Sequence, residues 1–302
     1  MDFKFGRNYQ LSITTALGEI LEIEPPFSVE FDVTRNMMND ANKASFRIYN
    51  LSEVTRNQIR RDPWSGTARR PVAFRAGYGD KLSEVFIGNL SQAWSVREGV
   101  DYITQVECIG GMIAYTNGFF SNQFPAGTST TTMIRTIMES LQRTSGVTTG
   151  VIGDFPGTIS RGISMVGSSM ELLKDLTGAN VFIDNNKIYC LNLNECLVGD
   201  ISVIDSDFGV LATPIKEEQG LNLEIVFEPR LKIAQLIELE LSRFTDQNSS
   251  STNQRTGQFN GAYQVIQLHH KGIISEAVAG SATTSVKLWY GNQLLQEVIG
   301  GS

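Results

Sequence analysis

The chain has 302 residues, of which 41% are hydrophobic and 19% are charged, and its net charge at pH 7 is −7. This composition is typical of a folded protein with a sizeable buried core, not of a disordered chain. A general nucleic-acid-binding protein needs a basic surface, so the acidic balance argues against that class.

The cysteine count and the absence of targeting signals narrow the cellular compartments in which the protein is expected. Cys108, Cys190 and Cys196 are an odd number and include no CxxC pair. This favours reduced thiols in a cytosolic environment and argues against a structural zinc site. The sequence shows no secretory signal and no apolar run long enough to span a membrane. We therefore expect no metal, no cofactor and no membrane segment.

Residues 1–111 have an almost entirely β pattern. A hairpin is expected at residues 11–23, and residues 27–50 alternate apolar and polar side chains in two runs joined by a polar link. Since successive side chains of a strand face opposite ways, these runs predict a half-buried antiparallel pair. A short helix follows, with Ser52 as N-cap. Further strands are predicted at residues 72–76, 85–88, 93–96 and 102–109, which together favour a small barrel or sandwich.

Residues 112–199 predict a small α+β domain. A helix is expected after Gly127, because apolar residues recur at helical spacing: Met133, Ile134, Ile137, Met138 and Leu141. A second helix is predicted from Ser168, where a capping-box pattern begins, to Gly178. Residues 180–191 predict a hairpin with an Asn-Asn turn. We interpret the apolar stripes as core, since no cofactor-binding motif lies among them.

The β pattern returns in residues 200–302. Strands are predicted at residues 221–228, 231–241, 263–270 and 285–290, and residues 242–262 predict a long polar loop. The first and last segments share one order of elements: a strand, a short break that contains an arginine (Arg35 or Arg230), and a second strand. We therefore hypothesise that the last segment is a structural duplicate of the first. The predicted fold class is mainly β with an α+β middle domain, in domains at 1–111, 112–199 and 200–302.

No residue pattern indicates an enzyme. His269 and His270, the only histidines, are neighbours on a predicted strand and face opposite ways, which disfavours a shared metal or a proton relay. The sequence contains no nucleophile elbow, P-loop, HExxH or EF-hand pattern. A carboxylate pair for glycoside hydrolysis stays open, because an acidic chain offers many candidates. We predict no catalytic, cofactor-binding or metal site.

A run of arginines precedes and enters the strand at residues 72–76. Nucleic-acid-binding surfaces of this kind need aromatic residues among the basic ones, and this run has few. We therefore interpret it as a solvated face or an intersubunit salt-bridge strip. Its members are Arg56, Arg60, Arg61, Arg69, Arg70 and Arg75.

Four motifs in the first third of the chain carry a family resemblance by their order and spacing. They are F-R-I-Y-N-L (Phe46 to Leu51), A-G-Y-G (Ala76 to Gly79), F-I-G-N-L (Phe86 to Leu90) and G-V-D-Y-I-T (Gly99 to Thr104). With them the chain resembles the baseplate hub proteins of contractile-tailed bacteriophages, and the later segments fit that family in their order of elements.

The resemblance implies a structural role in the tail baseplate of a virion. Hubs of this family are homotrimers in which each chain supplies two tube-like antiparallel β-barrel domains. Such a ring joins the hexameric tail tube, or a tube-initiator protein, to the trimeric central spike, among neighbouring baseplate proteins. Genomic DNA passes through it without specific binding, and assembly takes place in the host cytoplasm. The alternatives are the hub of a secretion-type injection machine, and a cell-envelope hydrolase or glycan-binding β-protein.

Acidic residues on the polar faces of the predicted strands are the candidate site. They are Glu30, Asp32, Glu224, Glu238 and Glu240. They form an ordinary solvated face or, under the resemblance, line a channel. A negative channel wall would repel DNA phosphates, because binding requires cationic groups that displace counterions.

Overall fold

The protein was analysed as a computed structural model. The structure describes residues 5–38, 41–62, 64, 69–178, 180–193, 195–217, 220–241, 259–277 and 280–289, and the backbone alone at 297–299. Most of the predicted polar loop at 242–262, and Tyr290 at the end of the last predicted strand, lie outside these residues.

The first β unit contains seven strands and one short helix. These are β1 (Arg7–Thr14), β2 (Ile20–Ile23), β3 (Val29–Asn36), β4 (Lys43–Tyr49), α1 (Glu53–Ile59), β5 (Pro71–Tyr78), β6 (Lys81–Glu98) and β7 (Asp101–Ile109). The predicted pair is confirmed, since β3 and β4 run antiparallel with Phe31 opposite Phe46. The Ser52 hydroxyl accepts the Thr55 N–H and caps α1, as expected.

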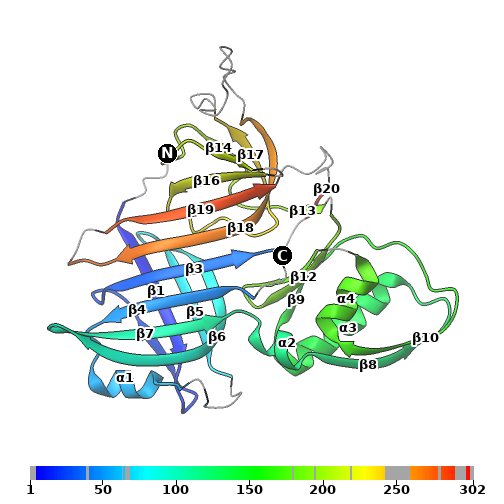
Figure 1. Cartoon of the computed structure of the whole chain (residues 1–302), viewed down its shortest axis with the longest axis horizontal. Helices are drawn as coiled ribbons and strands as arrows, with labels where there is room; N and C mark the ends of the chain where they lie inside the picture. The colour runs from blue at the N-terminus through cyan, green and yellow to red at the C-terminus, as the bar shows by residue number, and fades with distance from the viewer. Residues whose placement is uncertain are drawn as a thin grey trace.

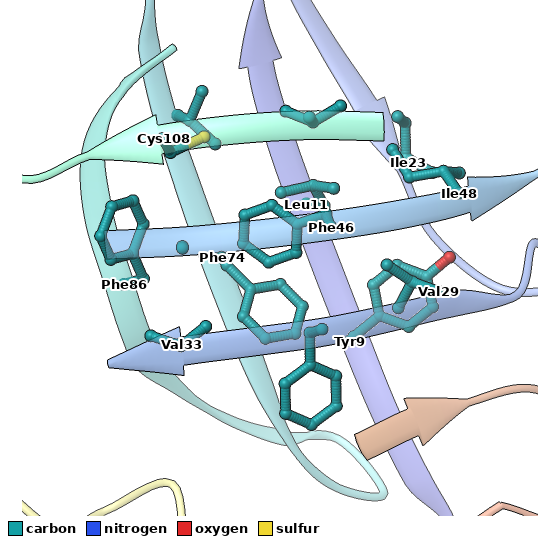
Figure 2. Packing of buried hydrophobic residues seen from close by; sticks show 14 of the residues in the cluster. Tyr9, Leu11, Ile23, Val29, Val33, Phe46, Ile48, Phe74, Phe86 and Cys108 are labelled. Carbon is teal, nitrogen blue, oxygen red and sulfur yellow. The ribbon is translucent and has the colours of Figure 1, made fainter. Parts of the chain in front are cut away.

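Aromatic rings fill the centre of this unit (Figure 2). The Phe74 ring lies 4.9 Å from the Phe46 ring and 5.3 Å from the Phe31 ring, centroid to centroid. All three side chains are at most 1% exposed. Tilted aromatic pairs at such distances are stabilising beyond the area that they bury.

Strand β6 differs from the prediction of two short strands at 85–88 and 93–96. It is one strand of 18 residues, which pairs with β5 up to Asn89 and with β7 from Asn89 onward. The register shifts between Leu90 and Gln92, where a bulge interrupts the alternation of buried and exposed residues. Because the alternation is interrupted there, the sequence of this one long strand resembles two short strands joined by a turn.

The middle unit is α+β and contains the predicted helices and hairpin. Its elements are α2 (Met112–Asn117), β8 (Phe119–Phe124), α3 (Thr130–Ser145), β9 (Thr148–Ile152), β10 (Ile163–Ser168), α4 (Ser169–Thr177), β11 (Asn180–Asp184) and β12 (Lys187–Leu191). The whole predicted stripe of α3 is buried. Positive φ angles of 45° and 60° at Asn185 and Asn186 fit a tight hairpin turn. The capping box at α4 does not form: Ser168 is the last residue of β10, and its side chain makes no capping bond.

The last unit is again β. It comprises β13 (Glu195–Leu197), β14 (Val203–Asp205), β15 (Ile215–Glu217), β16 (Gly220–Val226), β17 (Leu236–Glu240), β18 (Gly261–Ile274), β19 (Ala282–Trp289) and β20 (Glu297–Ile299). Strand β13 precedes the predicted boundary at residue 200, but it pairs with β20 of the last unit. The strand predicted over 231–241 begins only at Leu236. Turns precede it, and Ala234 has a φ of 63°, which a strand does not allow.

A single, mostly antiparallel sheet connects the two β units (Figure 1). Strand β18 pairs with β19 along one edge and with β3 along the other, from Gln267 opposite Asn36 to Ile274 opposite Val29. The strand order is β15-β16-β19-β18-β3-β4-β7-β6-β5-β1-β2. The chain is therefore mainly β with an α+β unit at its side, and the predicted fold class is confirmed.

Replacing Phe74 with alanine is expected to lower the free energy of unfolding by about 3–5 kcal/mol, because the lost ring leaves a cavity between two other rings. Urea unfolding followed by circular dichroism measures this loss. The same change at Phe119, which is 61% exposed, serves as the control and should cost about 0.5 kcal/mol. Equal losses in the two variants would contradict the assignment of Phe74 to the centre of the core.

Candidate functional site

One face of the continuous sheet is polar from β16 to β7, and rows of cross-strand neighbours run across it. The first row is Glu224, Ser285, His269, Thr34 and Lys43. The second row is Lys271, Asp32, Ser45 and Glu107. The third row is Ile273, Glu30, Arg47 and Gln105. Residues paired across antiparallel strands share a face, so these rows define one surface, which we call the polar face.

The structure brings three of the five predicted channel residues together. Glu30, Asp32 and Glu224 all lie on the polar face. Glu238 and Glu240 are exposed but belong to β17, which pairs with β14 and with the first residues of β18. These two carboxylates lie outside the run of strands that carries the polar face.

Basic side chains lie beside several of the acidic residues on this face. Asp32 lies 2.9 Å from His269 Nε2. The Arg47 guanidinium contacts two carboxylates, that of Glu30 at 3.3 Å and that of Glu98 at 3.0 Å. Lys287, which pairs with Asn222 and Gln267 next to the first row and so shares this face, lies 2.6 Å from Glu217. The polar face thus carries both signs of charge instead of the uniformly negative wall expected from the five acidic residues.

The polar face is hollowed in two places. One hollow of about 410 Å³ is bordered by Asp32, Ser45 and Glu107, and another of about 420 Å³ by Glu224 and His269. Asp32 and Glu107 are two carboxylates beside one hollow, but each already has a partner: His269 for Asp32, and the Ser45 hydroxyl, which donates to Glu107 at 3.0 Å. The arrangement is that of a hydrogen-bonded surface.

Behind this face, a buried ion pair joins all three units of the chain. Arg35 of β3 is 1% exposed, and its Nε and Nη2 donate to the two carboxylate oxygens of Asp184 in β11 at 2.8 and 2.5 Å. Its Nη1 donates to the Leu231 carbonyl of the last unit at 3.5 Å. Asn42 Nδ2 donates to Asp184 Oδ1 at 2.9 Å. Two-pronged pairing of this kind compensates two buried charges.

Burial and the neighbouring charge shift the pKa of Arg35 in opposite directions. Burial favours the neutral guanidine, but the charge and the hydrogen bonds of Asp184 more than offset it, so the pKa of Arg35 is raised above its usual value. The sequence contained a signal for this site. Arg35 follows Val29, Phe31 and Val33 at a spacing of two, so the alternation places a charged residue on the apolar side of β3.

The histidines face opposite ways, as predicted. His270 is fully buried, with Nδ1 2.9 Å from the Thr284 hydroxyl, whose oxygen also accepts the Glu228 N–H. Burial, followed by the charges of Arg35 and His269, lowers the pKa of His270 well below 6.5. His270 is thus a neutral core residue, whereas His269 contributes to the polar face.

The arginine run is not one solvated face. Arg70 is 6% exposed, and its guanidinium donates to the main-chain carbonyls of Thr14, Ile59 and Arg60. Arg56 stacks on the Tyr102 ring, 4.0 Å from its centroid. These arginines attach the C-terminal end of α1 to the first β unit, which the charge pattern of the sequence does not reveal.

The described residues contain no group of three or more histidine, cysteine, aspartate or glutamate side chains that could hold a metal ion. All three cysteines are buried free thiols, and burial raises the pKa of Cys190 and of Cys196 to about 12. Within the part of the chain that the structure describes, no helix is long and apolar enough to span a membrane.

Residues 11–254 match the family model described as Baseplate hub gp41. The chain belongs to this family. It is therefore a structural protein of the phage tail baseplate, and the resemblance seen in the sequence motifs is confirmed. A comparison with curated proteins gave no match.

Solved structures with the same fold include phage tail proteins. The 43 kDa tail protein of prophage MuSo2 from Shewanella oneidensis has a TM-score of 0.58 and 9% identity, over 95% of this chain and 99% of that chain. The tail protein from Neisseria meningitidis MC58 has a TM-score of 0.55 and 7% identity, over 98% and 100%. A chain of the lidded Francisella PdpA–VgrG complex has a TM-score of 0.50 and 10% identity, over 97% of this chain and 54% of that chain. At these identities the likeness shows the fold alone.

Replacing Asp184 with alanine is expected to cost about 3–5 kcal/mol of the free energy of unfolding, because the Arg35 charge stays buried without its partner. The double variant Arg35→Met, Asp184→Leu removes both charges and should be closer to the wild type than Asp184→Ala is. Urea unfolding of the three proteins gives the comparison. A double variant that loses as much stability as Asp184→Ala, or more, would show that the residues do not act as a pair.

The low pKa of His270 makes the stability depend on pH. The unfolded chain binds a proton at this histidine below about pH 6.5 while the folded chain does not, so the free energy of unfolding is highest above that pH and falls as the pH decreases. The slope contributed by one such group is at most about 1.4 kcal/mol per pH unit.

Urea unfolding between pH 7.5 and 5 tests this dependence. His270→Gln should reduce the slope, whereas His269→Gln, which changes a partly exposed histidine, serves as the control. If His270→Gln has the same slope as the wild type, the buried histidine is not the source of the acid sensitivity.

Proposed function

We propose that three copies of this chain form a closed ring in the virion baseplate, which joins the hexameric tail tube or its initiator to the trimeric central spike. Each chain would supply two tube-like β domains, at 1–111 and 200–302, and a peripheral domain at 112–199. Three chains then present six β units around one axis, which matches the sixfold symmetry of a tube on one side and the threefold symmetry of a spike on the other.

The observation that carries the proposal is the pairing of β3 with β18. This pairing gives the two β units one shared sheet, in which the polar face continues from one unit to the other. A channel wall needs such a continuous surface, because a gap between the units would expose backbone groups and core residues to the passing DNA. We infer that the polar face lines the channel.

The two ends of the polar face support ring closure. Among the described residues, β15 pairs with β16 alone, and the second half of β6 has β7 on one side and a single bridge to Arg61 on the other. Unpaired edges invite pairing with another chain. In the proposed ring, β15 of one copy lies beside the second half of β6 in the next copy, so that three sheets form one closed wall.

The charges of the polar face suit passage without binding. A protein binds DNA by releasing counterions from the phosphates, and this requires cationic groups that are free to contact them. Arg47 lies between Glu30 and Glu98, and Lys287 is held by Glu217. Lys43 and Lys271 are exposed cations of the same face, but with Arg47 they are three cations against the four carboxylates of Glu30, Asp32, Glu107 and Glu224 in the three rows. The rows therefore carry no net positive charge that would hold phosphates.

The role that follows is mechanical and not enzymatic. The ring would be assembled in the host cytoplasm, would start the tube, hold the spike among neighbouring baseplate proteins and release it when the tail contracts. Asp32 and Glu107, the carboxylate pair that borders one hollow, both have hydrogen-bonding partners. We therefore expect purified protein to show no turnover of peptidoglycan.

Charge reversal tests the channel assignment, and the chain provides its own control. The variant Asp32→Lys, Glu224→Lys places two cations on the polar face, whereas Glu238→Lys, Glu240→Lys makes the same change in charge outside it. We expect phage carrying the first variant to assemble tails but to release DNA at least about tenfold more slowly, since the two substitutions give the polar face a net positive charge, which holds phosphates. The second variant should release DNA normally. Normal release by the first, or slow release by both, would contradict the assignment.

A further inference from the structure

The β8–β10 ribbon is an exposed two-stranded sheet with two open edges. Among the described residues, strand β8 pairs only with β10, and β10 only with β8. Helices α3 and α4 pack on one side of the ribbon (Figure 1). Phe120 and Phe124 are buried and stacked 6.2 Å apart, which fixes the ribbon to the core of the middle unit.

The register shows which backbone groups point outward. The Ser169 N–H donates to the Gly118 carbonyl at 2.8 Å, next to the pair Phe119–Ser168. In an antiparallel pair, hydrogen-bonded and non-hydrogen-bonded positions alternate. Phe120 and Asn122 therefore bond to β10, and the N–H and C=O groups of Phe119 and Ser121 point to the outer edge of β8.

The ribbon lacks the features that normally protect such an edge. Proteins keep an exposed edge from pairing with other chains by means of charged side chains, prolines or bulges. Residues 108–134 contain no aspartate, glutamate, lysine or arginine, although 19% of the whole chain is charged. Phe119 and Val166 expose 61% and 62% of their surface on the outer face of the ribbon. An edge of this kind is suited to a permanent strand partner.

We propose that an extended, uncharged segment of another baseplate protein adds to the outer edge of β8 as a third strand. Backbone hydrogen bonds to Phe119 and Ser121 would hold it, with an apolar side chain beside Phe119. The β10 edge suits a strand less well, because Gly167 has a φ of 151° and α4 begins two residues later. A different protein is the occupant because the ribbon belongs to the middle unit, at the side of the large sheet (Figure 1). In the proposed ring, on which this inference rests, copies of the chain meet through β15 and the second half of β6 instead.

Amide hydrogen exchange on the purified chain and on assembled tails tests the proposal at single residues. In the purified chain, the amides of Phe120 and Asn122 should exchange slowly and that of Ser121 quickly. In assembled tails, the Ser121 amide should become slow as well, which gives protection at successive positions. A Ser121 amide that exchanges equally fast in tails would overturn the proposal. Concentration-dependent protection of Ser121 in the purified chain would also overturn it, because the occupant would then be a second copy.

A pair of proline variants identifies the edge. Ser121→Pro removes the outward N–H of β8, and Ser164→Pro makes the same change on the outer edge of β10; neither touches the bonds between the two strands. Loss of one backbone hydrogen bond should weaken the partner's binding at least about fivefold, so Ser121→Pro should lower the fraction of complete baseplates seen by electron microscopy, with Ser164→Pro unchanged. Equal effects of the two variants, with both proteins folded by circular dichroism, would contradict the β8 assignment.

Discussion

A buried ion pair between Arg35 and Asp184 fixes the three units of this chain in one arrangement. A charge in a protein interior has lost its hydration, and an opposite charge beside it compensates that loss of free energy. Arg35 comes from β3 and Asp184 from the end of β11, so the hairpin of the middle unit must lie against the end of β3. The next residue, Asn185, reinforces this position, since its side-chain oxygen accepts the Ile87 N–H of β6 at 3.1 Å.

The position of β3 then determines the functional surface. Strand β3 carries the ion pair on its inner side and Glu30 and Asp32 on its outer side, and it pairs along its edge with β18. One strand thus joins the middle unit, both β units and the polar face. A shift of this strand by one residue would exchange its two faces, burying Asp32 and exposing Arg35. The ion pair and the polar face therefore depend on the same register.

Local patterns in the sequence predicted the elements but not their neighbours. The period of two identified β3 and β4, the helical stripe identified α3, and the Asn-Asn turn identified the β11–β12 hairpin. The pairing of β3 with β18 joins residues that are more than two hundred positions apart in the sequence. Its hydrogen bonds use backbone groups, which every residue has, so no side-chain pattern predicts this pairing. For the same reason the separation of Glu238 and Glu240 from the other acidic residues, and the basic partners of Glu30 and Asp32, became visible only in three dimensions. Arg35 is the exception, since its place on the apolar side of β3 could be deduced from the alternation.

The most direct measurement is the mass of the protein in solution, by light scattering on a size-exclusion column over a range of concentrations, alone and with the spike protein of the same phage. The open edges of β15 and β6 and the shared sheet lead us to expect a closed ring of about 100 kDa, three times the chain mass of 33.3 kDa. A mass of about 33 kDa at every concentration, unchanged when the spike is present, would contradict the ring and with it the channel assigned to the polar face.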